Sequence, residues 1–349
     1  MKATYHKHIL TFKRASGTSR GILKTKETWY IVITEGSKQG IGECGILRGL
    51  SVDDRPDYEE RLQWTCANIE KGPERLWSVL KEFPSIQFGV EMAFLSLKAQ
   101  DPFVLFPSKF TQHKSSIDIN GLVWMGDEVF MKEQIEQKLE AGFDCIKMKI
   151  GAISFDKEME LLRFIRKHYD ASKITVRVDA NGGFAFAKAK EVLQQLALLD
   201  IHSIEQPIAV GQWEEMKQLC EETPTPIALD EELIGVVDVT KKRNLLQTIR
   251  PQYIILKPSF IGGYQGSEEW IDQAEALDIG WWITSALESN IGLNAIAQWT
   301  YELQAKGPQG LGTGSLFTNN IPSPLEVKEG GLHYNNTLYW DFNTDTLCL

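Results

Sequence analysis

The chain has 349 residues, 43% of them hydrophobic and 24% charged, which is enough apolar material for a sizeable core and argues against disorder. The formal net charge is −10, and lysines and arginines are interspersed with acids, so nucleic acid is not an expected partner. No apolar run reaches the roughly 18 residues of a membrane span, and Met1 to Arg14 lacks the apolar core of a secretion signal. We therefore expect a cytoplasmic protein without a membrane partner.

Residues 1–110 are typical of an α+β domain. The segments His8–Arg14 and Thr28–Thr34 alternate apolar and polar residues, as strands do, whereas Tyr58–Lys71 and Gly89–Gln100 have apolar residues at helical spacing. Together they predict a first domain of mixed strands and helices that ends near residue 110.

Residues 111–315 have a different rhythm, in which short buried strands alternate with amphipathic helices. The strands are expected at Ile117–Val123, Cys145–Ile150, Ile174–Ala180, His202–Gln206, Ile227–Asp230, Tyr253–Lys257 and Trp281–Thr284, with the glycine-rich Gly310–Gly314 as a weak eighth. The helices between them include Asp127–Ala141, Ser154–His168, Ala187–Leu199 and Ser267–Leu277. This alternation favours a parallel α/β sheet with right-handed crossovers, and eight strands favour closure into a barrel.

Residues 316–349 no longer alternate between strand and helix. Within them, Gly331–Phe342 predicts a hairpin that turns at Asn335–Asn336. We expect this tail to pack back against the first domain.

Polar residues recur at or near the ends of the predicted strands, at intervals of 25 to 30 residues: Lys149, Asp179, Glu205, Asp230, Lys257 and Ser285. Because all strands of a parallel barrel end on one face, these side chains should converge on one pocket. The three successive acids would repel one another there unless some are protonated or a cation lies among them. Oxygen-only ligands favour Mg²⁺, with Mn²⁺ as a plausible substitute. Each acid could instead cap the helix after its strand, but the repeat in three consecutive strands favours the metal.

Lys147 and Lys149 stand two residues apart in Cys145–Ile150 and so share one face of their strand. An outward-facing pair would lie beneath helices, so the barrel interior is the better location. Two neighbouring ammonium groups should lower each other's pKa and help to supply a base near neutral pH. Lys257 should face them across the pocket. The alternative is a solvated pair with Lys257 bonded to Asp230 or Glu231, although lysines within apolar strands are hard to place on a surface.

This set of groups suits the removal of a proton α to a carboxylate. A divalent ion would bind the substrate carboxylate and stabilise the enediolate, while an amine on one face takes the proton. Lysine or histidine bases that work with Mg²⁺ are a known feature of the enolase superfamily.

In its motifs the sequence resembles that superfamily, in the muconate-lactonising branch, over essentially the whole chain. The matching pieces are Lys147-Met-Lys149, Asp179-Ala-Asn181, Glu205-Gln-Pro207, Asp230-Glu231 and Lys257-Pro-Ser259. The resemblance implies a modified TIM barrel, (β/α)7β, capped by an α+β domain that the N-terminus and the C-terminal tail build together. It implies Asp179, Glu205 and Asp230 as magnesium ligands, Lys149 as the acid/base lysine with Lys147 beside it, and Lys257 on the opposite face.

Two segments fall where the capping loops of that family cover the substrate, Ser16–Gly21 and Leu47–Asp54. Their glycines would supply flexibility. Thr18, Arg20 and Arg48 are candidate substrate contacts, and solvated surface roles are equally open for each.

The segments Thr284–Gly292 and Gly310–Thr318 resemble the corresponding parts of the o-succinylbenzoate synthases within this branch. By that resemblance Ser285, Thr313 and Gly314 would line the pocket for the succinyl side of a small-molecule carboxylate substrate. The implied reaction is the syn dehydration of 2-succinyl-6-hydroxy-2,4-cyclohexadiene-1-carboxylate, a step towards menaquinone.

Other functions stay open at this point. Dipeptide epimerases and N-acylamino-acid racemases of the same superfamily keep both lysines and the acids, although Gly312-Thr-Gly314 lacks the acid that would hold a dipeptide ammonium. A Schiff-base aldolase and a non-catalytic barrel scaffold are weaker alternatives. The sequence does not decide the oligomeric state, and a homo-oligomer is one option.

Overall fold

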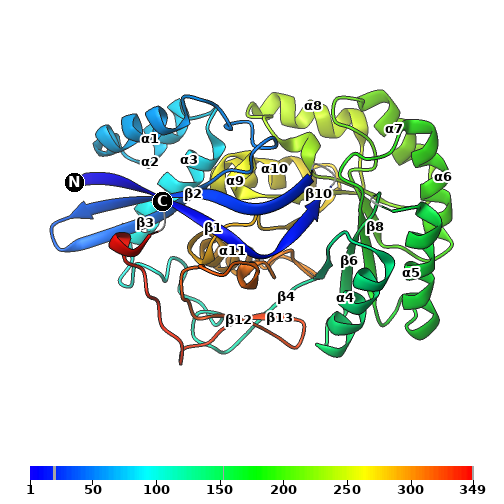
Figure 1. Ribbon diagram of the computed structural model, residues 1–349. Helices are drawn as coiled ribbons and strands as arrows, with labels where there is room; N and C mark the ends of the chain where they lie inside the picture. The colour runs from blue at the N-terminus through cyan, green and yellow to red at the C-terminus, as the bar shows by residue number, and fades with distance from the viewer. Residues whose placement is uncertain (19–20, 152, 348–349) are drawn as a thin grey trace.

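The computed structural model describes residues 1–18, 21–151 and 153–347. Its N-terminal lobe is an antiparallel sheet in the order β1-β2-β3, covered by three helices. The strands are β1 (Lys2–Thr18), β2 (Gly21–Glu35) and β3 (Lys38–Gly45), and the helices are α1 (Tyr58–Ala67), α2 (Pro73–Val79) and α3 (Pro84–Lys98), with a short turn η1 (Ile69–Lys71). The long β1–β2 ribbon extends from this lobe towards the barrel (Figure 1).

Helix α3 lies unusually close to strand β3 because glycines form the contact. A Cβ atom on Gly42 would lie 1.9 Å from the carbonyl oxygen of Gly89, and one on Gly40 would lie 2.2 Å from that of Ala93. Both distances are far below van der Waals contact, so only glycine allows this approach. The two glycines are two residues apart, which places them on the same face of β3.

The second lobe is a parallel barrel whose seven strands follow the order β11-β10-β9-β8-β7-β6-β5. The strands are β5 (Gly121–Val123), β6 (Cys145–Lys149), β7 (Thr175–Asp179), β8 (Ser203–Glu205), β9 (Ile227–Leu229), β10 (Tyr253–Leu256) and β11 (Gly280–Ile283). The helices are α4 (Glu128–Glu140), α5 (Phe155–His168), α6 (Phe186–Ala197), α7 (Trp213–Glu222), α8 (Val239–Ile249), α9 (Pro258–Ile261), α10 (Gly263–Glu275) and α11 (Asn290–Glu302), with short turns η2 (Glu231–Leu233) and η3 (Gly314–Leu316). The predicted modified TIM barrel with a separate α+β lobe is confirmed.

Two residues complete the ring in the eighth position. Gln309 bridges Ile119 and Gly310 bridges Thr284, both in parallel orientation. The backbone nitrogen of Gly310 donates to the oxygen of Ile283 at 2.8 Å, and that of Asn120 donates to the oxygen of Gln309 at 2.9 Å. The expected eighth strand at Gly310–Gly314 is therefore misplaced, because the pairing covers residues 309 and 310 and the chain after them turns away.

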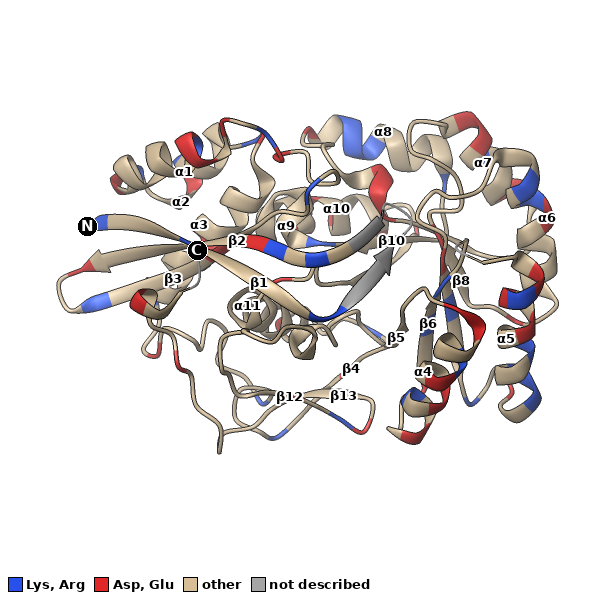
Figure 2. Ribbon diagram, in the orientation of Figure 1, with Lys and Arg blue, Asp and Glu red and all other residues tan. Residues whose placement is uncertain are grey.

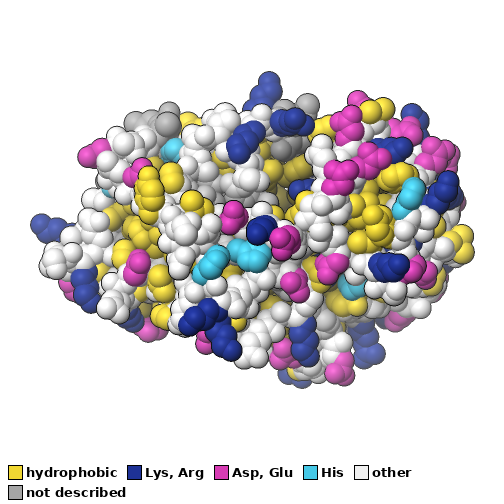
Figure 3. Space-filling model, turned by 90° about the horizontal axis from the view of Figure 1, so that it is seen from below, with side chains coloured by type: hydrophobic (Ala, Val, Ile, Leu, Met, Phe, Trp, Pro, Cys, Tyr) yellow, Lys and Arg dark blue, Asp and Glu magenta, His cyan; other side chains and the backbone are white. Residues whose placement is uncertain are grey.

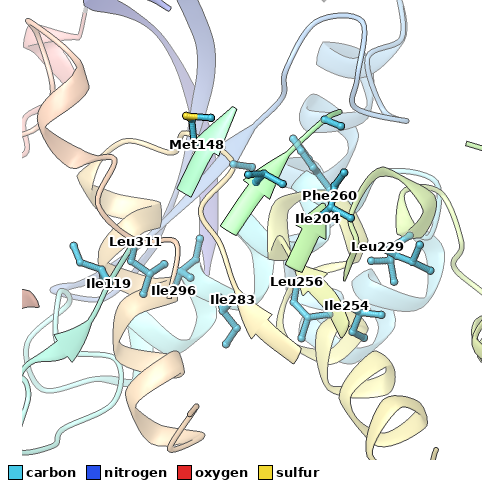
Figure 4. Packing of buried hydrophobic residues seen from close by; sticks show 14 of the residues in the cluster. Ile119, Met148, Ile204, Leu229, Ile254, Leu256, Phe260, Ile283, Ile296 and Leu311 are labelled. Atoms are coloured by element: carbon cyan, nitrogen blue, oxygen red, sulfur yellow. The ribbon is translucent and has the colours of Figure 1, made fainter. Parts of the chain in front are cut away.

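Alternation along the strands separates the barrel interior from its outer layer. Lys147 and Lys149 point inward, whereas Met148 between them is buried under the helices. Figure 4 shows Met148, Ile204, Leu256 and Ile283 among the apolar side chains of the core, to which they are contributed by β6, β8, β10 and β11. This core fixes the register of each strand, because a slip of one residue would exchange the buried apolar set for the polar one.

Two further predictions of elements need correction. The expected strand Ile117–Val123 is two pieces: β4 (Ile117–Asp118) pairs with β13, whereas the residues from Ile119 through β5 join the barrel. The expected hairpin turn at Asn335–Asn336 is also wrong. The hairpin consists of β12 (Leu325–Lys328) and β13 (Gly331–Tyr334), so the chain turns at Glu329 and Gly330, both of which have positive φ.

The C-terminal tail does reach the N-terminal lobe. The ring of Phe342, just before the last turn η4 (Thr344–Thr346), meets that of Tyr30 edge-on with 5.2 Å between centroids. Asn319 donates to the backbone oxygen of Ile9 and accepts from the backbone nitrogen of Thr11, both at 2.8 Å. Strand β1 is thus fixed by residues about 310 positions later in the chain.

Charges of both signs are intermixed over the molecule. Lysines and arginines alternate with acids along the barrel helices (Figure 2), and the face seen in Figure 3 carries both signs between apolar patches. No described helix combines the length and the hydropathy needed to cross a bilayer.

Candidate active site

The predicted strand-end residues meet at one mouth of the barrel. The register pairs Lys149 with Asp179 and Asp179 with Glu205, so these three side chains stand side by side on β6, β7 and β8. Neighbouring strands are about 4.8 Å apart, which sets the spacing of the row. Asp230 follows β9 and Lys257 follows β10, which continues the row around the barrel.

Each acid of the row contacts at least one lysine. Lys149 Nζ donates to Asp179 Oδ2 at 2.8 Å, and Lys147 Nζ lies 3.2 Å from the same oxygen. Lys147 also pairs with Glu205, and Lys257 pairs with Asp230. The three carboxylates and Lys147 are at most 7% exposed, so these charges face one another with little water between them.

The close acids change how the lysines titrate. Burial alone would lower the pKa of Lys147, but the nearby charges of Asp179, Glu205 and Asp230 outweigh it and raise that pKa above its ordinary value. The pKa of Lys257 is raised in the same way, chiefly by Asp230. The expectation that Lys147 and Lys149 depress each other's pKa is therefore wrong for Lys147, because its ammonium contacts the carboxylates of Asp179 and Glu205.

A second layer of polar groups holds the row in place. Asn181 Oδ1 accepts from Lys149 Nζ at 2.7 Å, and Asn181 Nδ2 donates to Glu231 Oε1 at 3.1 Å. Asn181 adopts a left-handed backbone, φ 44°, which asparagine tolerates better than most residues. From the sequence, Asn181 stood within a motif without a role, and Glu231 was considered only as an alternative partner of Lys257. Both residues come just after a strand-end acid, and that position was the signal that could have assigned them a role beside the acids.

The three acids suit a divalent cation by their chemistry. Burial and the charges of Asp179 and Asp230 raise the pKa of Glu205 well above normal, and a dication would remove that repulsion. Glu205 Oε1 is buried without a hydrogen-bond partner among the described residues, so it is an acceptor open to such an ion. Within the described parts of the chain, no three acids, histidines or cysteines converge closely enough to hold a metal as they stand. The lysines occupy the positions between the acids instead.

Above the row lies a cavity of about 420 Å³. Lys147, Lys149 and Lys257 all line it, and so do Ser285, just after β11, and Thr313, just after the eighth position of the ring. Ser285 Oγ and Thr313 Oγ1 share a hydrogen bond of 2.7 Å. Among the predicted substrate contacts, Gly314 is placed differently: it does not line the cavity, and a Cβ there would meet Asn290 Oδ1 at 2.6 Å. The chain turns at Thr313, which directs Gly314 towards α11.

The N-terminal lobe contributes Leu23, Leu47, Arg48 and Leu50 to the lining of the cavity. Arg48 is bound to Glu27 and Asp54, with 2.6 Å from its Nε to Glu27 Oε2. The expected loop Ser16–Gly21 is largely strand, because the backbone of Thr18 pairs with Gly21 in the β1–β2 ribbon. The side chain of Thr18 and all of Arg20 lie outside what the structure describes, so their predicted contacts stay predictions.

Comparison with protein families agrees with this geometry. Residues 130–337 match the enolase C-terminal domain-like family, and residues 3–97 match the family described as MenC, N-terminal domain. The chain belongs to the enolase superfamily. The first of these matches spans more than half of the chain and contains the six lysines and acids of the row.

Relatives and solved structures of the superfamily extend the match to the whole chain. It is 44% identical to an o-succinylbenzoate synthase from Desulfotalea psychrophila, over 95% of this chain and 98% of that protein. The crystal structure of MenC from the same organism superimposes with a TM-score of 0.85 and 40% identity, and covers 95% of this chain and 99% of that one. A muconate lactonizing enzyme from Pseudomonas fluorescens has a TM-score of 0.82 at 21% identity over 97% of this chain and 96% of its own, which supports the fold alone.

Proposed function

We propose that this protein is an o-succinylbenzoate synthase, which removes water from 2-succinyl-6-hydroxy-2,4-cyclohexadiene-1-carboxylate. The site geometry supports a reaction that begins with loss of a proton α to a carboxylate. The observation that carries the choice of substrate is the 44% identity to such a synthase over both the N-terminal lobe and the barrel. Both lobes line the cavity, so likeness in both bears on which substrate fits.

Lys149 is the proposed acid and base. As a free amine, its Nζ takes the α-proton, and the electron pair of the broken C–H bond is held as negative charge on the carboxylate and ring. That pair then forms the new double bond as the C–O bond breaks. The proton then joins the departing hydroxide, so one molecule of water leaves. The oxygens of Asp179 and Asn181, at 2.8 and 2.7 Å, fix Nζ in one position for both transfers.

Lys257 acts from the other end of the row. Strands β7, β8 and β9 separate its strand from that of Lys149, so the two amines approach a bound substrate from different sides. Its ammonium, held by Asp230, stabilises negative charge on the reacting ring. Lys147, buried between Asp179 and Glu205, offsets the repulsion between those two acids in the free protein.

Asp179, Glu205 and Asp230 are the proposed ligands of one Mg²⁺, for which Mn²⁺ can substitute. Members of the superfamily use Mg²⁺, and all-oxygen donors of this kind suit both ions. When bound, the ion supplies positive charge to the substrate carboxylate. Glu205 Oε1, which lacks a hydrogen-bond partner among the described residues, is the donor most available to it.

Turnover is the direct test of this function. Purified protein with Mg²⁺ and the cyclohexadiene carboxylate should form the aromatic product, which is followed by ultraviolet absorbance, and excess EDTA should stop the reaction. Wild-type protein that binds Mg²⁺ but forms no aromatic product would disprove the proposed substrate.

A second candidate is racemisation of N-acylamino acids at the same site. Lys149 and Lys257 line one cavity, and a racemase needs one amine for each face of the α-carbon. Uptake of deuterium at the α-carbon of an N-succinylamino acid, measured by NMR in D₂O, reports this activity. A rate of exchange above that of dehydration would favour the racemase.

A further inference from the structure

Three charged side chains are buried together where the N-terminal lobe meets the loop after β11. They are Lys26 on β2, Glu43 on β3 and Glu288, and each is at most 4% exposed. A Cβ on Gly292 would lie 2.8 Å from the side chain of Glu288 and 2.9 Å from Glu43 Oε2, so both acids pack on this glycine. None of the three lines the cavity. We call them the interlobe cluster.

Glu43 crosses between the lobes. Its carboxylate accepts hydrogen bonds from the backbone nitrogens of Ser289 and Gly292, both at 2.8 Å, and from the hydroxyl of Ser289 at 2.5 Å. These groups belong to the start of α11, where backbone N–H groups have no partner within the helix. A strand of the N-terminal lobe therefore caps a helix of the barrel.

Glu288 holds the loop that forms one wall of the cavity. Its Oε2 accepts from the backbone nitrogen of Ala286 at 2.7 Å, and its Oε1 accepts from Ser259 Oγ at 2.5 Å. Ala286 follows Ser285, and Ser259 comes two residues after Lys257. Leu287, which lies between Ala286 and Glu288, has a backbone φ of 63°. A residue with an apolar side chain adopts this left-handed conformation only when its surroundings enforce it.

Lys26 is the single cation of the cluster. Its ammonium is completely buried and has no hydrogen-bond partner among the described residues. Burial lowers the pKa of Lys26, and the charges of Glu43 and Glu288 oppose this only in part. Burial likewise raises the pKa of Glu288, and the charge of Lys26 opposes that rise. A Cβ on Gly45 would lie 2.5 Å from Lys26 Nζ and 3.7 Å from Glu43 Oε1, so the ammonium is packed near the carboxylate of Glu43. A neighbouring negative charge offsets part of the cost of burying an ammonium.

We propose that the interlobe cluster sets the position of the Ser285–Ser289 loop from the N-terminal lobe, and thereby the affinity of the site for its substrate. Lys26 and Glu288 are positioning residues in this proposal, since they act through the backbone of the loop and touch no substrate. The apolar contact of Leu287 with Leu10, Phe12 and Phe317 lies in the same interface. The cavity wall is thus assembled only when both lobes are docked.

Hydrogen–deuterium exchange of the loop tests the positioning without any assay of activity. In Lys26→Met the backbone amides of Ala286 and Leu287 should exchange at least about tenfold faster than in wild type, because Glu288 loses its counter-charge. The matched control is Glu91→Gln, since Glu91 also crosses between the lobes and accepts from the backbone nitrogens of Tyr264 and Gln265. In Glu91→Gln the exchange rates of the Ala286 and Leu287 amides should equal those of wild type.

Steady-state kinetics test the effect on affinity, and this part rests on the proposed function. We expect KM of Lys26→Met and of Glu288→Gln to rise about tenfold while kcat falls less than about threefold, because the wall moves and Lys149 does not. Ser259→Ala, which removes one hydrogen bond and no charge, should move KM in the same direction by a smaller factor. Ser259→Ala serves as the test variant if Lys26→Met and Glu288→Gln fail to fold.

The outcomes separate the two proposals. If the wild type does not turn over the cyclohexadiene, the proposed function fails, whereas the exchange experiment still tests the cluster. Loop exchange and KM that match wild type in Lys26→Met, or loop exchange that rises equally in Glu91→Gln, would show that the cluster only holds the lobes together.

Discussion

Lys149 is fixed more firmly than an ordinary lysine at the end of a strand. Two oxygens from different residues, Asp179 Oδ2 and Asn181 Oδ1, hold its ammonium at 2.8 and 2.7 Å. Both acceptors come from β7 or the residues just after it, so the position of Nζ depends on the pairing of β6 with β7. A base held in this way loses little conformational freedom when substrate binds.

Removal of this amine should stop the chemistry and spare the fold. We expect Lys149→Ala to lower kcat by about 10²- to 10⁴-fold or more, the usual contribution of a positioned acid/base group. Circular dichroism and the melting temperature check the fold. The matched control is Lys173→Ala, an exposed lysine that should keep full activity. Dehydration by Lys149→Ala within threefold of wild type would refute the role of this residue.

The sequence predicted the row of charges but not the residues that hold it. Asp179, Glu205 and Lys149 follow from strand period and barrel geometry, because the register of parallel strands carries them to one mouth. The burial of Lys26 and Glu288 could not be found in this way, since they lie about 260 residues apart, on β2 and on the loop after β11, and the motif Thr284–Gly292 gave Glu288 itself no role. A buried charge that has a distant partner leaves no local pattern.

At the scale of elements, the contact of α3 with β3 depends on glycine. We expect Gly42→Ala to cost at least about 3 kcal/mol of unfolding free energy, because its Cβ would lie 1.9 Å from a backbone oxygen that cannot rotate away. Gly36→Ala is the control: its Cβ meets nothing within 4 Å, and its cost is the roughly 1–2 kcal/mol of a left-handed backbone. Urea unfolding measures both variants. Equal losses of unfolding free energy in Gly42→Ala and Gly36→Ala would mean that α3 can shift away from β3, and would contradict the prediction.

The free energy of unfolding should depend on pH through Glu91 of α3, which accepts hydrogen bonds from the start of α10. Burial raises the pKa of Glu91 to about 8 from 4.5, although the amides of Tyr264 and Gln265 oppose the rise. The folded protein therefore holds this proton more tightly than the unfolded chain, and that part of the stability is lost as the pH rises from 4.5 through about 8. Wild type should lose stability relative to Glu91→Gln across this window in urea unfolding. Parallel curves for the two proteins would contradict it.

The elements that the sequence misplaced share a physical cause. The run Ile117–Val123 reads as one strand, yet its two ends pair with different sheets, and tertiary pairing decides such cases. The hairpin of the tail turns at Glu329-Gly330, where glycine tolerates a positive φ of 71°, and Asn335 follows the second strand. The long barrel helices were placed correctly because their apolar faces repeat over several turns.

At the scale of the whole molecule, the site belongs to both lobes. The barrel supplies the row of lysines and acids, and the N-terminal lobe supplies Arg48 and the apolar roof of the cavity. The predicted boundaries near residues 110 and 315 stay a proposal, as do the ligand and catalytic roles. The superfamily and the barrel are established by the fold and by the matching families.

The central claim is that Asp179, Glu205 and Asp230 together hold one divalent ion. Titration of the protein with Mn²⁺, followed by electron paramagnetic resonance of the free ion, measures this directly. We predict one site per chain in wild type, competed by Mg²⁺, and its loss in Glu205→Gln with the fold intact. Binding of Mn²⁺ by Glu205→Gln with the affinity and stoichiometry of wild type, or no binding by wild type, would contradict the account.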